Sequence, residues 1–162
     1  MSLFKPSLMT KRITDITPAM LKHLGVKALL LDVDNTLVSY AEHEPIEGAI
    51  QWTKEMNRAG FKLIVVSNNY ASRVAPFVKK FDLPYITFAM KPFPFGYIKA
   101  SKMLGVPHRE CVIIGDQIFT DVTGANLCGM KSILLEPVEM EKGISIGLRR
   151  LWEKRIRKKY GE

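Results

Sequence analysis

Short, nearly unbroken apolar runs alternate with amphipathic stretches along most of this chain. The runs are rich in Leu, Ile and Val, and a turn or a polar stretch bounds each of them. Strands of a parallel sheet covered on both faces have this pattern, because neither face meets water. We therefore predict five strands, at residues 27–33, 62–67, 85–89, 111–115 and 131–135.

The segments between these runs have the periodicity of helices with one apolar face. They lie at residues 18–24, 46–59, 71–81, 94–104 and 120–128. Alternating strands and helices predict an α/β fold with a doubly wound, Rossmann-like and mostly parallel sheet, joined by right-handed crossovers. No repeat, low-complexity tract or linker interrupts the pattern, so we expect a single domain over residues 1–162.

The composition is typical of a soluble globular protein, with 47% hydrophobic and 25% charged residues. Charged residues interrupt every apolar run before it reaches the roughly 20 residues of a membrane-spanning helix. The first residues lack the features of a signal peptide. Cys111 and Cys128 have no metal-type spacing and fit small buried apolar positions in a reducing compartment. We therefore expect a cytoplasmic protein.

Positive charge is concentrated at the C-terminal end. The net charge is +8, and residues 144–162 hold seven cations against two acids. A helix at about 144–160 would either pack its apolar stripe on the sheet with the cations solvated, or lie at an anionic membrane surface. It would alternatively follow a phosphodiester backbone. The stripe consists of Ile144, Leu148, Leu151, Trp152 and Ile156.

Polar residues follow the predicted carboxyl ends of four strands, the edge where open parallel sheets bind ligands. The first strand runs into Asp32 and Asp34, which would share one face with Cα atoms about 6.5–7 Å apart. Two carboxylates that close repel by roughly 2.5 kcal/mol at an effective dielectric near 20, so a cation is needed beside them. The following strands add Ser67 with Asn68, then Lys91, then Asp116 with Asp121.

Each of these groups has an ordinary explanation as a turn, a helix cap or a solvated side chain. Together and in this order, the stretches LLLDVDNTLVSY, VVSNN, MKPFP and IIGDQIFTDV resemble the four motifs of the haloacid dehalogenase superfamily of phosphohydrolases. The most specific of them is Asp-x-Asp-x-Thr. The chain is also similar in its length and in the details of these motifs to the YqeG-like branch, subfamily IIIA. That branch is linked to phosphatidylglycerophosphate phosphatases.

The resemblance implies a role for each matched residue. Asp32 would be the nucleophile that forms an aspartyl phosphate, and Asp34 would protonate the leaving oxygen and then activate water. Ser67 would donate to a phosphoryl oxygen, helped by the backbone amide of Asn68. Lys91 would neutralise that oxygen and stabilise the nucleophile. The expected activity is phosphomonoester hydrolysis without a cap domain.

One lysine cannot balance these acids and an incoming phosphate, so a divalent cation is implied. Ligands that are all oxygen favour Mg²⁺ over zinc. By resemblance, the protein ligands are the Asp32 carboxylate, the main-chain carbonyl of Asp34 and the Asp116 carboxylate. Asp121 would either support these ligands or bind the metal directly.

Response-regulator receivers combine similar residues on a similar sheet. In receivers the phosphoacceptor lies on a middle strand and a Lys-Pro follows the last one, whereas here Lys91-Pro92 follows the third predicted strand. The order favours a phosphatase. A phospho-dependent binding or signalling module is the non-enzyme alternative.

Two spacings leave no room for a cap over the site. Only 32 residues separate Asp34 from Ser67, and 23 separate Ser67 from Lys91. An open site suits a large substrate, and we favour an anionic lipid head group such as phosphatidylglycerophosphate at the inner membrane face. A nucleotide, a nucleic-acid end or a sugar phosphate is the alternative, and a second subunit could cover the site. The loop at 38–45, with Tyr40, His43 and Glu44, is either a solvated loop or a flap over substrate.

Overall fold

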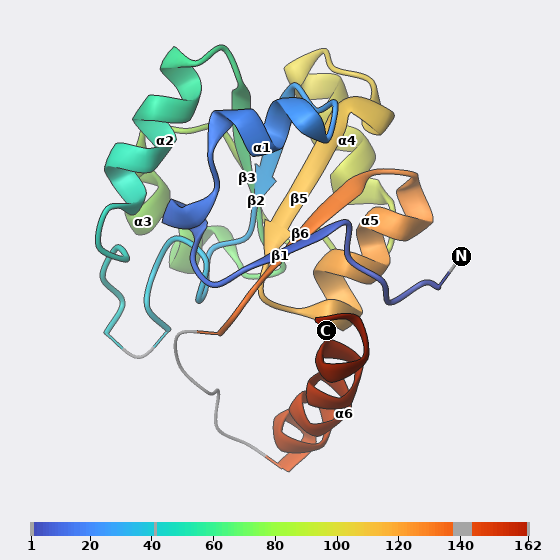
Figure 1. Cartoon of the computed structure of the whole chain (residues 1–162). Helices are drawn as coiled ribbons and strands as arrows, with labels where there is room; N and C mark the ends of the chain where they lie inside the picture. Colours follow the sequence, from blue (N-terminus) through green and yellow to red (C-terminus); the bar gives the residue numbers. More distant parts are fainter. Residues whose placement is uncertain (1, 41, 138–143, 162) are drawn as a thin grey trace.

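The computed structural model describes residues 2–40, 42–137 and 144–161, whose strands form one six-stranded sheet (Figure 1). The strand order is β1-β6-β5-β2-β3-β4, and every neighbouring pair is parallel. The predicted fold class is confirmed. The strands are β1 (Leu8–Thr10), β2 (Ala28–Leu31), β3 (Lys62–Val66), β4 (Tyr85–Ile86), β5 (Cys111–Gly115) and β6 (Lys131–Leu135).

Helices cover both faces of this sheet (Figure 1). They are α1 (Pro18–His23), α2 (Ala49–Arg58), α3 (Ala71–Phe81), α4 (Phe95–Leu104), α5 (Thr123–Cys128) and α6 (Ile144–Tyr160). Two 3₁₀ turns, η1 (Ile13–Asp15) and η2 (His108–Glu110), and a π-helical turn, η3 (Ile118–Val122), complete the described elements.

Alternate residues of the central strand β2 reach the two halves of the core, because successive side chains of a strand point to opposite faces. Leu29 and Leu31 pack with α1, α2 and α3, whereas Ala28 and Leu30 pack with α4 and α5. All four are fully buried, which explains why the sequence of β2 is continuously apolar.

The structure differs from the predicted elements mainly at their ends. β1 was not predicted, since it is only three residues long and lies at the edge, where Leu8 pairs with Ile133 of β6. The strand expected at 85–89 ends at Ile86, because Phe88 and Met90 have positive φ angles of 49° and 58° that a strand cannot contain. The helix expected at 120–128 begins instead as the π-helical turn η3.

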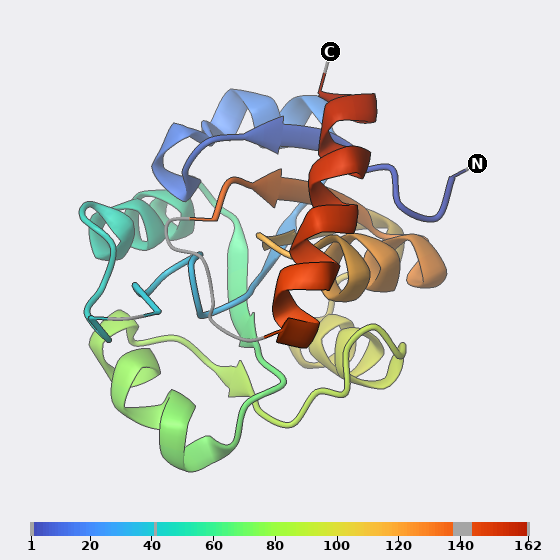
Figure 2. The same ribbon diagram turned by 90° about the horizontal axis from the view of Figure 1, so that it is seen from below.

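α6 lies across the carboxyl-terminal edge of the sheet, which Figure 2 shows from below. The prediction that its apolar stripe packs on the sheet holds for Ile156, which packs on a cluster that includes Leu134 of β6, but not for three other stripe residues. Leu148, Leu151 and Trp152 are exposed, whereas Arg150 and Glu153 are buried. The sheet presents backbone carbonyls and carboxylates at this edge, so a polar helix face is the one that fits. The side chain of Ile144 lies outside the described residues.

Membrane-spanning helices were not expected from the sequence. In the described part of the chain, every helix is too short or too polar to cross a bilayer.

Close packing of α4 on α5 requires a glycine. A Cβ on Gly124 would overlap the ring of Tyr97, which is fully buried and donates its hydroxyl to the Thr120 carbonyl at 2.7 Å. We expect Gly124→Ala to lower the free energy of unfolding by about 1–3 kcal/mol, as overpacked cores do.

Gly147→Ala in α6 is the matched control, because a Cβ there would meet no described atom within 4 Å. Alanine should raise the free energy of unfolding by about 0.5–1 kcal/mol at this helical position. Urea denaturation measures both variants, and equal effects would contradict the packing argument.

Candidate active site

Five of the seven predicted site residues line one cleft at the carboxyl ends of the strands, and the other two, Asp116 and Asp121, are buried next to Asp32. The volume of the cleft is about 290 Å³, and residues from the loops that follow β2, β3 and β4, from the segment after β5 including η3, and from α6 surround it. The expected convergence of these strand ends is therefore found. The lining consists of Asp32, Asp34, Tyr40, Ser67, Asn68, Asn69, Lys91, Gln117, Thr120 and Arg149.

Lys91 joins two of the acids. Its ammonium lies 2.9 Å from Asp32 Oδ1 and 2.7 Å from Asp121 Oδ1, and its side chain is almost completely buried. The second oxygen of Asp121, Oδ2, accepts a hydrogen bond from the Gln117 backbone amide at 3.2 Å. Both Asp121 oxygens are thus engaged, and this carboxylate positions the lysine.

Asp121 reaches this position through two local features. It lies in the π-helical turn η3. Such turns are rare in proteins overall, but they often occur at functional sites. Gly115, the last residue of β5, lies directly beneath it, and a Cβ there would overlap the Asp121 carboxylate. The glycine in the Gly-Asp motif is therefore needed for the close approach of Asp121 to the sheet.

Asp116 is fully buried at the end of β5, and α6 holds it. Arg150 Nη2 lies 2.9 Å from Asp116 Oδ2, and Arg150 Nη1 donates to the Asp116 carbonyl at 3.2 Å. Asn35 Nδ2 donates to the same carboxylate oxygen at 3.4 Å. Glu153, one turn further along α6, accepts from Arg150 at 2.9 Å and from the Ile118 amide at 3.1 Å.

Asp34 has partners of its own. Arg73 of α3 lies 2.9 Å from Asp34 Oδ1, and Asn69 Nδ2 donates to Oδ2 at 2.9 Å. The sequence predicts that Asp32 and Asp34 share one strand face, with metal and lysine between them. That explanation is wrong for Asp34, because β2 ends at Leu31 and the chain then turns.

Ser67 and Asn68 have different surroundings. Ser67 is buried at the end of β3, and its Oγ accepts from the Asn69 amide at 3.1 Å. The Asn68 side chain binds the backbone of Lys91 twice, accepting from its amide at 2.7 Å and donating to its carbonyl at 3.1 Å. Asn68 therefore fixes the loop that carries the lysine, which includes the cis Lys91–Pro92 peptide.

Burial and charge shift the ionisation of the central pair. Burial raises the pKa of Asp32 to about 8, with the charges of Asp121 and Asp116 adding to this and Lys91 opposing it. Burial would lower the pKa of Lys91, but Asp121 and Asp32 outweigh it and hold this pKa well above its ordinary value. The ammonium therefore stays charged at neutral pH.

The donor set fits a hard divalent cation. One carboxylate oxygen from each of Asp32, Asp116 and Asp121 lies within 4.8 Å of the others. Oxygen-only donors suit Mg²⁺, and a bound dication would also lower the raised pKa of Asp32. Lys91 and the Gln117 amide engage both oxygens of Asp121, whereas the ion pair of Asp32 with Lys91 uses Oδ1, so we expect Asp32 and Asp116 to be the carboxylate ligands of a metal.

The family model of haloacid dehalogenase-like hydrolases matches residues 21–129. The chain belongs to this family. The resemblance seen in the four motifs is confirmed, and so is the prediction of a family enzyme. The described residues between β2 and β3 form loops and α2, and those between β3 and Lys91 form loops, α3 and β4, without a separate cap.

Two relatives refine the comparison. A Bacillus subtilis (strain 168) protein named "Probable phosphatase YqeG" is 37% identical over 153 residues, covering 94% of this chain and 89% of that protein. The predicted likeness to the YqeG-like branch is therefore confirmed. The glyceraldehyde 3-phosphate phosphatase of Methanopyrus kandleri is 27% identical over 103 residues, covering 58% of this chain and 44% of that protein. This chain thus spans less than half of the archaeal enzyme.

Solved structures share the fold at low sequence identity. A HAD phosphatase from Thermococcus onnurineus superimposes with a TM-score of 0.59 at 18% identity, over 73% of this chain and 89% of that one. YfnB from Bacillus subtilis, in a crystal form bound to magnesium, gives 0.61 at 14% identity, over 74% and 90%.

Three arginines that contact the site are not predicted from the sequence. Arg73 neutralises Asp34, and Arg150 and Arg157 bind Asp116 from α6. A signal existed for α6, since Arg150, Glu153 and Arg157 form a polar stripe at helical spacing opposite the apolar one. Arg73 had a weaker signal, as a lone cation in the first turn of a helix that begins at the catalytic edge.

Among the described residues of the loop at 38–45, one contributes to the cleft. Tyr40 lines it, and its ring lies 5.7 Å from the Arg73 guanidinium carbon. His43 stacks on Phe77 with ring centroids 6.1 Å apart, and Glu44 pairs with Lys80 at 3.4 Å. Those two residues contact α3 instead of the cleft.

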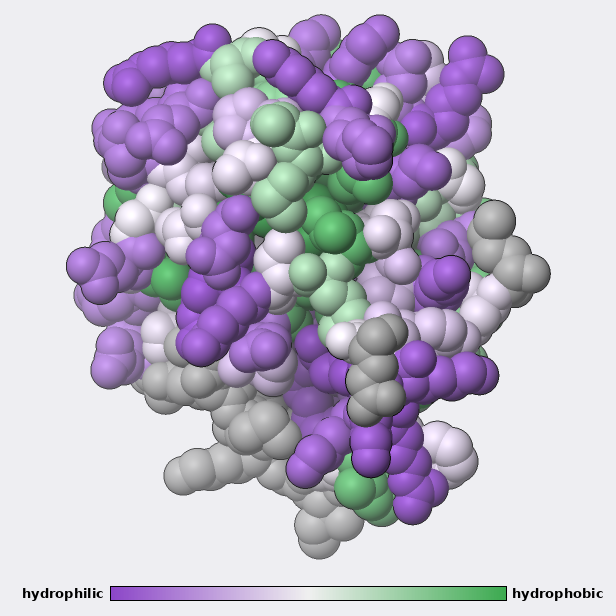
Figure 3. Space-filling view, viewed as in Figure 1, coloured by the Kyte–Doolittle hydropathy of each residue, from purple (hydrophilic) through white to green (hydrophobic). Residues whose placement is uncertain are grey.

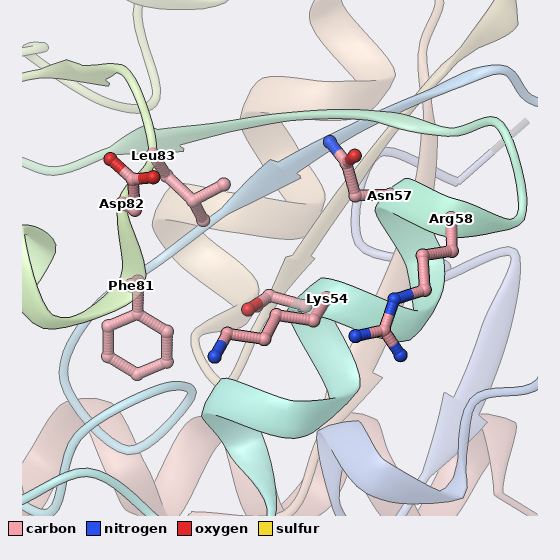
Figure 4. Close-up of a pocket in the computed structure, with 7 residues that line it drawn as sticks. Lys54, Asn57, Arg58, Phe81, Asp82 and Leu83 are labelled. Carbon is pink, nitrogen blue, oxygen red and sulfur yellow. The ribbon is translucent and has the colours of Figure 1, made fainter.

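A second hollow of about 250 Å³ lies between α2 and the end of α3 (Figure 4). Helices of a parallel sheet run opposite to the strands, so the ends of α2 and α3 lie toward the amino edge. This hollow is lined by Thr53, Lys54, Asn57, Arg58, Phe81, Asp82 and Leu83, none of which lines the cleft that contains Asp32.

The raised pKa of Asp32 predicts how the stability of the metal-free protein depends on pH. The folded state keeps the Asp32 proton up to about pH 8, whereas the unfolded chain loses it near pH 4. The folded state binds more protons in this window, so the free energy of unfolding should fall as pH rises. The limiting slope is about 1.4 kcal/mol per pH unit.

Urea denaturation in a chelator at several pH values measures this slope, and Asp32→Asn supplies the control. Lys91 stays protonated throughout the window, so removing the Asp32 carboxyl should flatten the pH dependence. A slope that is the same in both proteins would contradict the raised pKa.

Proposed function

We propose that this hydrolase is a Mg²⁺-dependent phosphomonoesterase that works through an aspartyl phosphate on Asp32. One observation carries the proposal: the Asp32 carboxylate lies in an open cleft, 2.9 Å from a buried ammonium and within reach of the Asp116 carboxylate. A nucleophilic carboxylate, a fixed cation and a metal site are the parts that phosphoryl transfer requires.

In the first step, a carboxylate oxygen of Asp32 attacks phosphorus, and the bond from phosphorus to the ester oxygen breaks. Asp34 gives its proton to the departing alcohol. In the second step, Asp34 takes a proton from water, the water oxygen attacks phosphorus, and the acyl phosphate bond breaks to release inorganic phosphate and the Asp32 carboxylate. The separate hydrogen-bond partners of Asp34 support its separate role.

Other residues bind and orient the phosphoryl group. Ser67 is buried at the cleft with a hydroxyl that can donate to a phosphoryl oxygen, and the Lys91 ammonium offsets the negative charge of the reacting group. Asp32, Asp116 and the Asp34 carbonyl would hold Mg²⁺. When bound, the ion would supply positive charge to stabilise the phosphoryl oxygens.

For the substrate, we favour a large or lipid-linked anionic phosphomonoester, phosphatidylglycerophosphate in particular. The open cleft, the likeness to the YqeG-like branch and the basic α6 support this choice. In this proposal α6 also provides peripheral contact with the inner face of a membrane.

Replacement of the nucleophile tests the activity. We expect Asp32→Asn to abolish Mg²⁺-dependent release of phosphate from an aryl phosphate, because an amide cannot form the acyl phosphate. Asp82→Asn is a matched control at an exposed residue with positive φ, which asparagine tolerates, and it should keep full activity. Undiminished turnover by Asp32→Asn would exclude the proposed nucleophile.

A panel of phosphorylated lipids, nucleotides and sugars then ranks the substrates by kcat/KM. Highest turnover on a nucleotide or a sugar would overturn the lipid assignment. A wild-type protein that binds Mg²⁺ and phosphate but hydrolyses no phosphomonoester would instead be a binding or signalling module.

Loss of the Arg73 guanidinium should weaken catalysis. Arg73→Met keeps the apolar stem but removes a charge-assisted hydrogen bond to Asp34, worth about 1.5–3 kcal/mol. We expect kcat on the aryl phosphate to fall about 10- to 100-fold, with a smaller change in KM.

Arg58→Met, at the end of α2 on the opposite edge, is the matched control and should be neutral. Arg73→Lys should recover part of kcat because it restores the charge. If Arg73→Met behaved like Arg58→Met in steady-state kinetics, Arg73 would have no role in positioning Asp34.

A further inference from the structure

Exposed apolar side chains border the catalytic cleft, and we call this cluster the apolar rim. Two of its residues directly neighbour cleft residues in the chain, since Tyr70 follows Asn69 and Met90 precedes Lys91, and the other three lie within four positions of Lys91. The Tyr70 and Phe88 rings stack with centroids 5.6 Å apart. The rim consists of Tyr70, Phe88, Met90, Phe93 and Phe95, which are 48–69% exposed.

In the loop that supplies most of the rim, the charged side chain is buried and the large apolar side chains are exposed. Ala89 and Lys91 are buried, whereas the larger apolar residues Phe88, Met90 and Phe93 point outward. Lys91 must face inward to reach Asp32, and Ala89 packs under Gly96, where a Cβ would lie 2.7 Å from that of Ala89. Ala89 and Lys91 thus occupy the buried positions of this loop, and its large apolar side chains remain in solvent.

Backbone hydrogen bonds hold the rim in this orientation. The Phe88 amide donates to the Asn69 carbonyl and the Ala89 amide to the Ser67 carbonyl, both at 2.9 Å. Phe88 and Met90 have positive φ angles, which bulky residues rarely adopt. Exposed apolar patches of this kind mark interaction sites.

α6 borders the cleft with another apolar strip. Arg149 lines the same cleft as Asn69 and Lys91, so α6 and the rim flank one opening. Leu148, Leu151 and Trp152 are exposed on the outer face of α6. Figure 3 shows hydrophobic atoms among strongly hydrophilic ones where α6 lies, at the bottom of the view.

The outer face of α6 is also strongly cationic. Four of its cations are exposed, and the one acid between residues 148 and 159, Glu153, is buried against Arg150. The Arg155 guanidinium lies 5.7 Å from the centroid of the Trp152 ring. The exposed cations are Lys154, Arg155, Lys158 and Lys159.

We propose that the apolar rim and the outer face of α6 together dock on an anionic lipid bilayer, with the catalytic cleft facing the head groups. The inference rests on the proposed function for its substrate and adds the rim as the docking element. At the interface of an anionic bilayer, the aromatic rim can insert among the lipids, and the cations of α6 can bind negatively charged head groups. A second copy of this chain would bring the same four exposed cations of α6 to this face, and the two copies would repel each other.

This orientation matches the shape of the site. The cleft of about 290 Å³ accommodates a head group and leaves acyl chains outside. With the rim in the interface, a phosphomonoester on a lipid head group reaches Asp32 while the lipid stays in the membrane.

Vesicle sedimentation at low salt tests the docking. We expect the wild-type protein to sediment with equimolar phosphatidylcholine and phosphatidylglycerol vesicles and to stay in solution with phosphatidylcholine alone. Phe93→Ser/Phe95→Ser should weaken the binding at least tenfold. The control Met103→Ser/Leu127→Ser removes two apolar residues that are also more than half exposed, near the ends of α4 and α5 at the opposite edge, and should bind like wild type. Tyr70→Ser, on the other loop, is a second test of the rim.

Three results would overturn the inference. In the first, wild type does not sediment with anionic vesicles, and in the second, the rim variants bind vesicles like wild type. In the third, light scattering shows that wild type is a dimer and that changing the rim makes it monomeric. Thermal unfolding of each variant shows whether it is folded. Aryl phosphate turnover, measured on the same samples, separates the two proposals: sedimentation without turnover keeps the docking and rejects the phosphatase, and turnover without sedimentation rejects only the docking.

Discussion

The ammonium of Lys91, held between the carboxylates of Asp32 and Asp121, is the interaction on which the catalytic edge depends. Buried acids close together repel one another, and the lysine offsets that repulsion where water cannot. Several segments that are distant in the sequence hold the lysine and its partners in place. Asn68 fixes the lysine backbone, and Gly115 leaves room for Asp121 against the sheet.

The neighbouring acids are neutralised independently, and this divides the site into two parts. Asp34 pairs with Arg73 of α3, whereas Asp116 pairs with Arg150 of α6. The nucleophile and the acid–base residue proposed here therefore lie in different electrostatic surroundings although they are two residues apart. Two similar carboxyl groups can take different roles when their surroundings differ in this way.

The polarity of the catalytic edge also determines the outer surface. Because carboxylates and backbone carbonyls end the strands, α6 turns Arg150 and Glu153 inward and leaves Leu148, Leu151 and Trp152 in solvent. The β4–α4 loop follows the same rule, with Lys91 inside and Phe93 outside. One constraint, the burial of charge at the site, thus explains why apolar side chains collect around its opening.

The sequence alone determined five of the six described strands, the fold class and the convergence of Asp32, Ser67, Lys91 and Asp116 on one edge. These follow from local periodicity and from the rule that parallel strands place their carboxyl ends together. The tertiary structure decided the partner of Asp34, the engagement of Asp121 with Lys91, and which face of α6 meets the protein. A helical pattern shows that two faces differ but not which one is buried, since that choice depends on what the sheet edge presents across space.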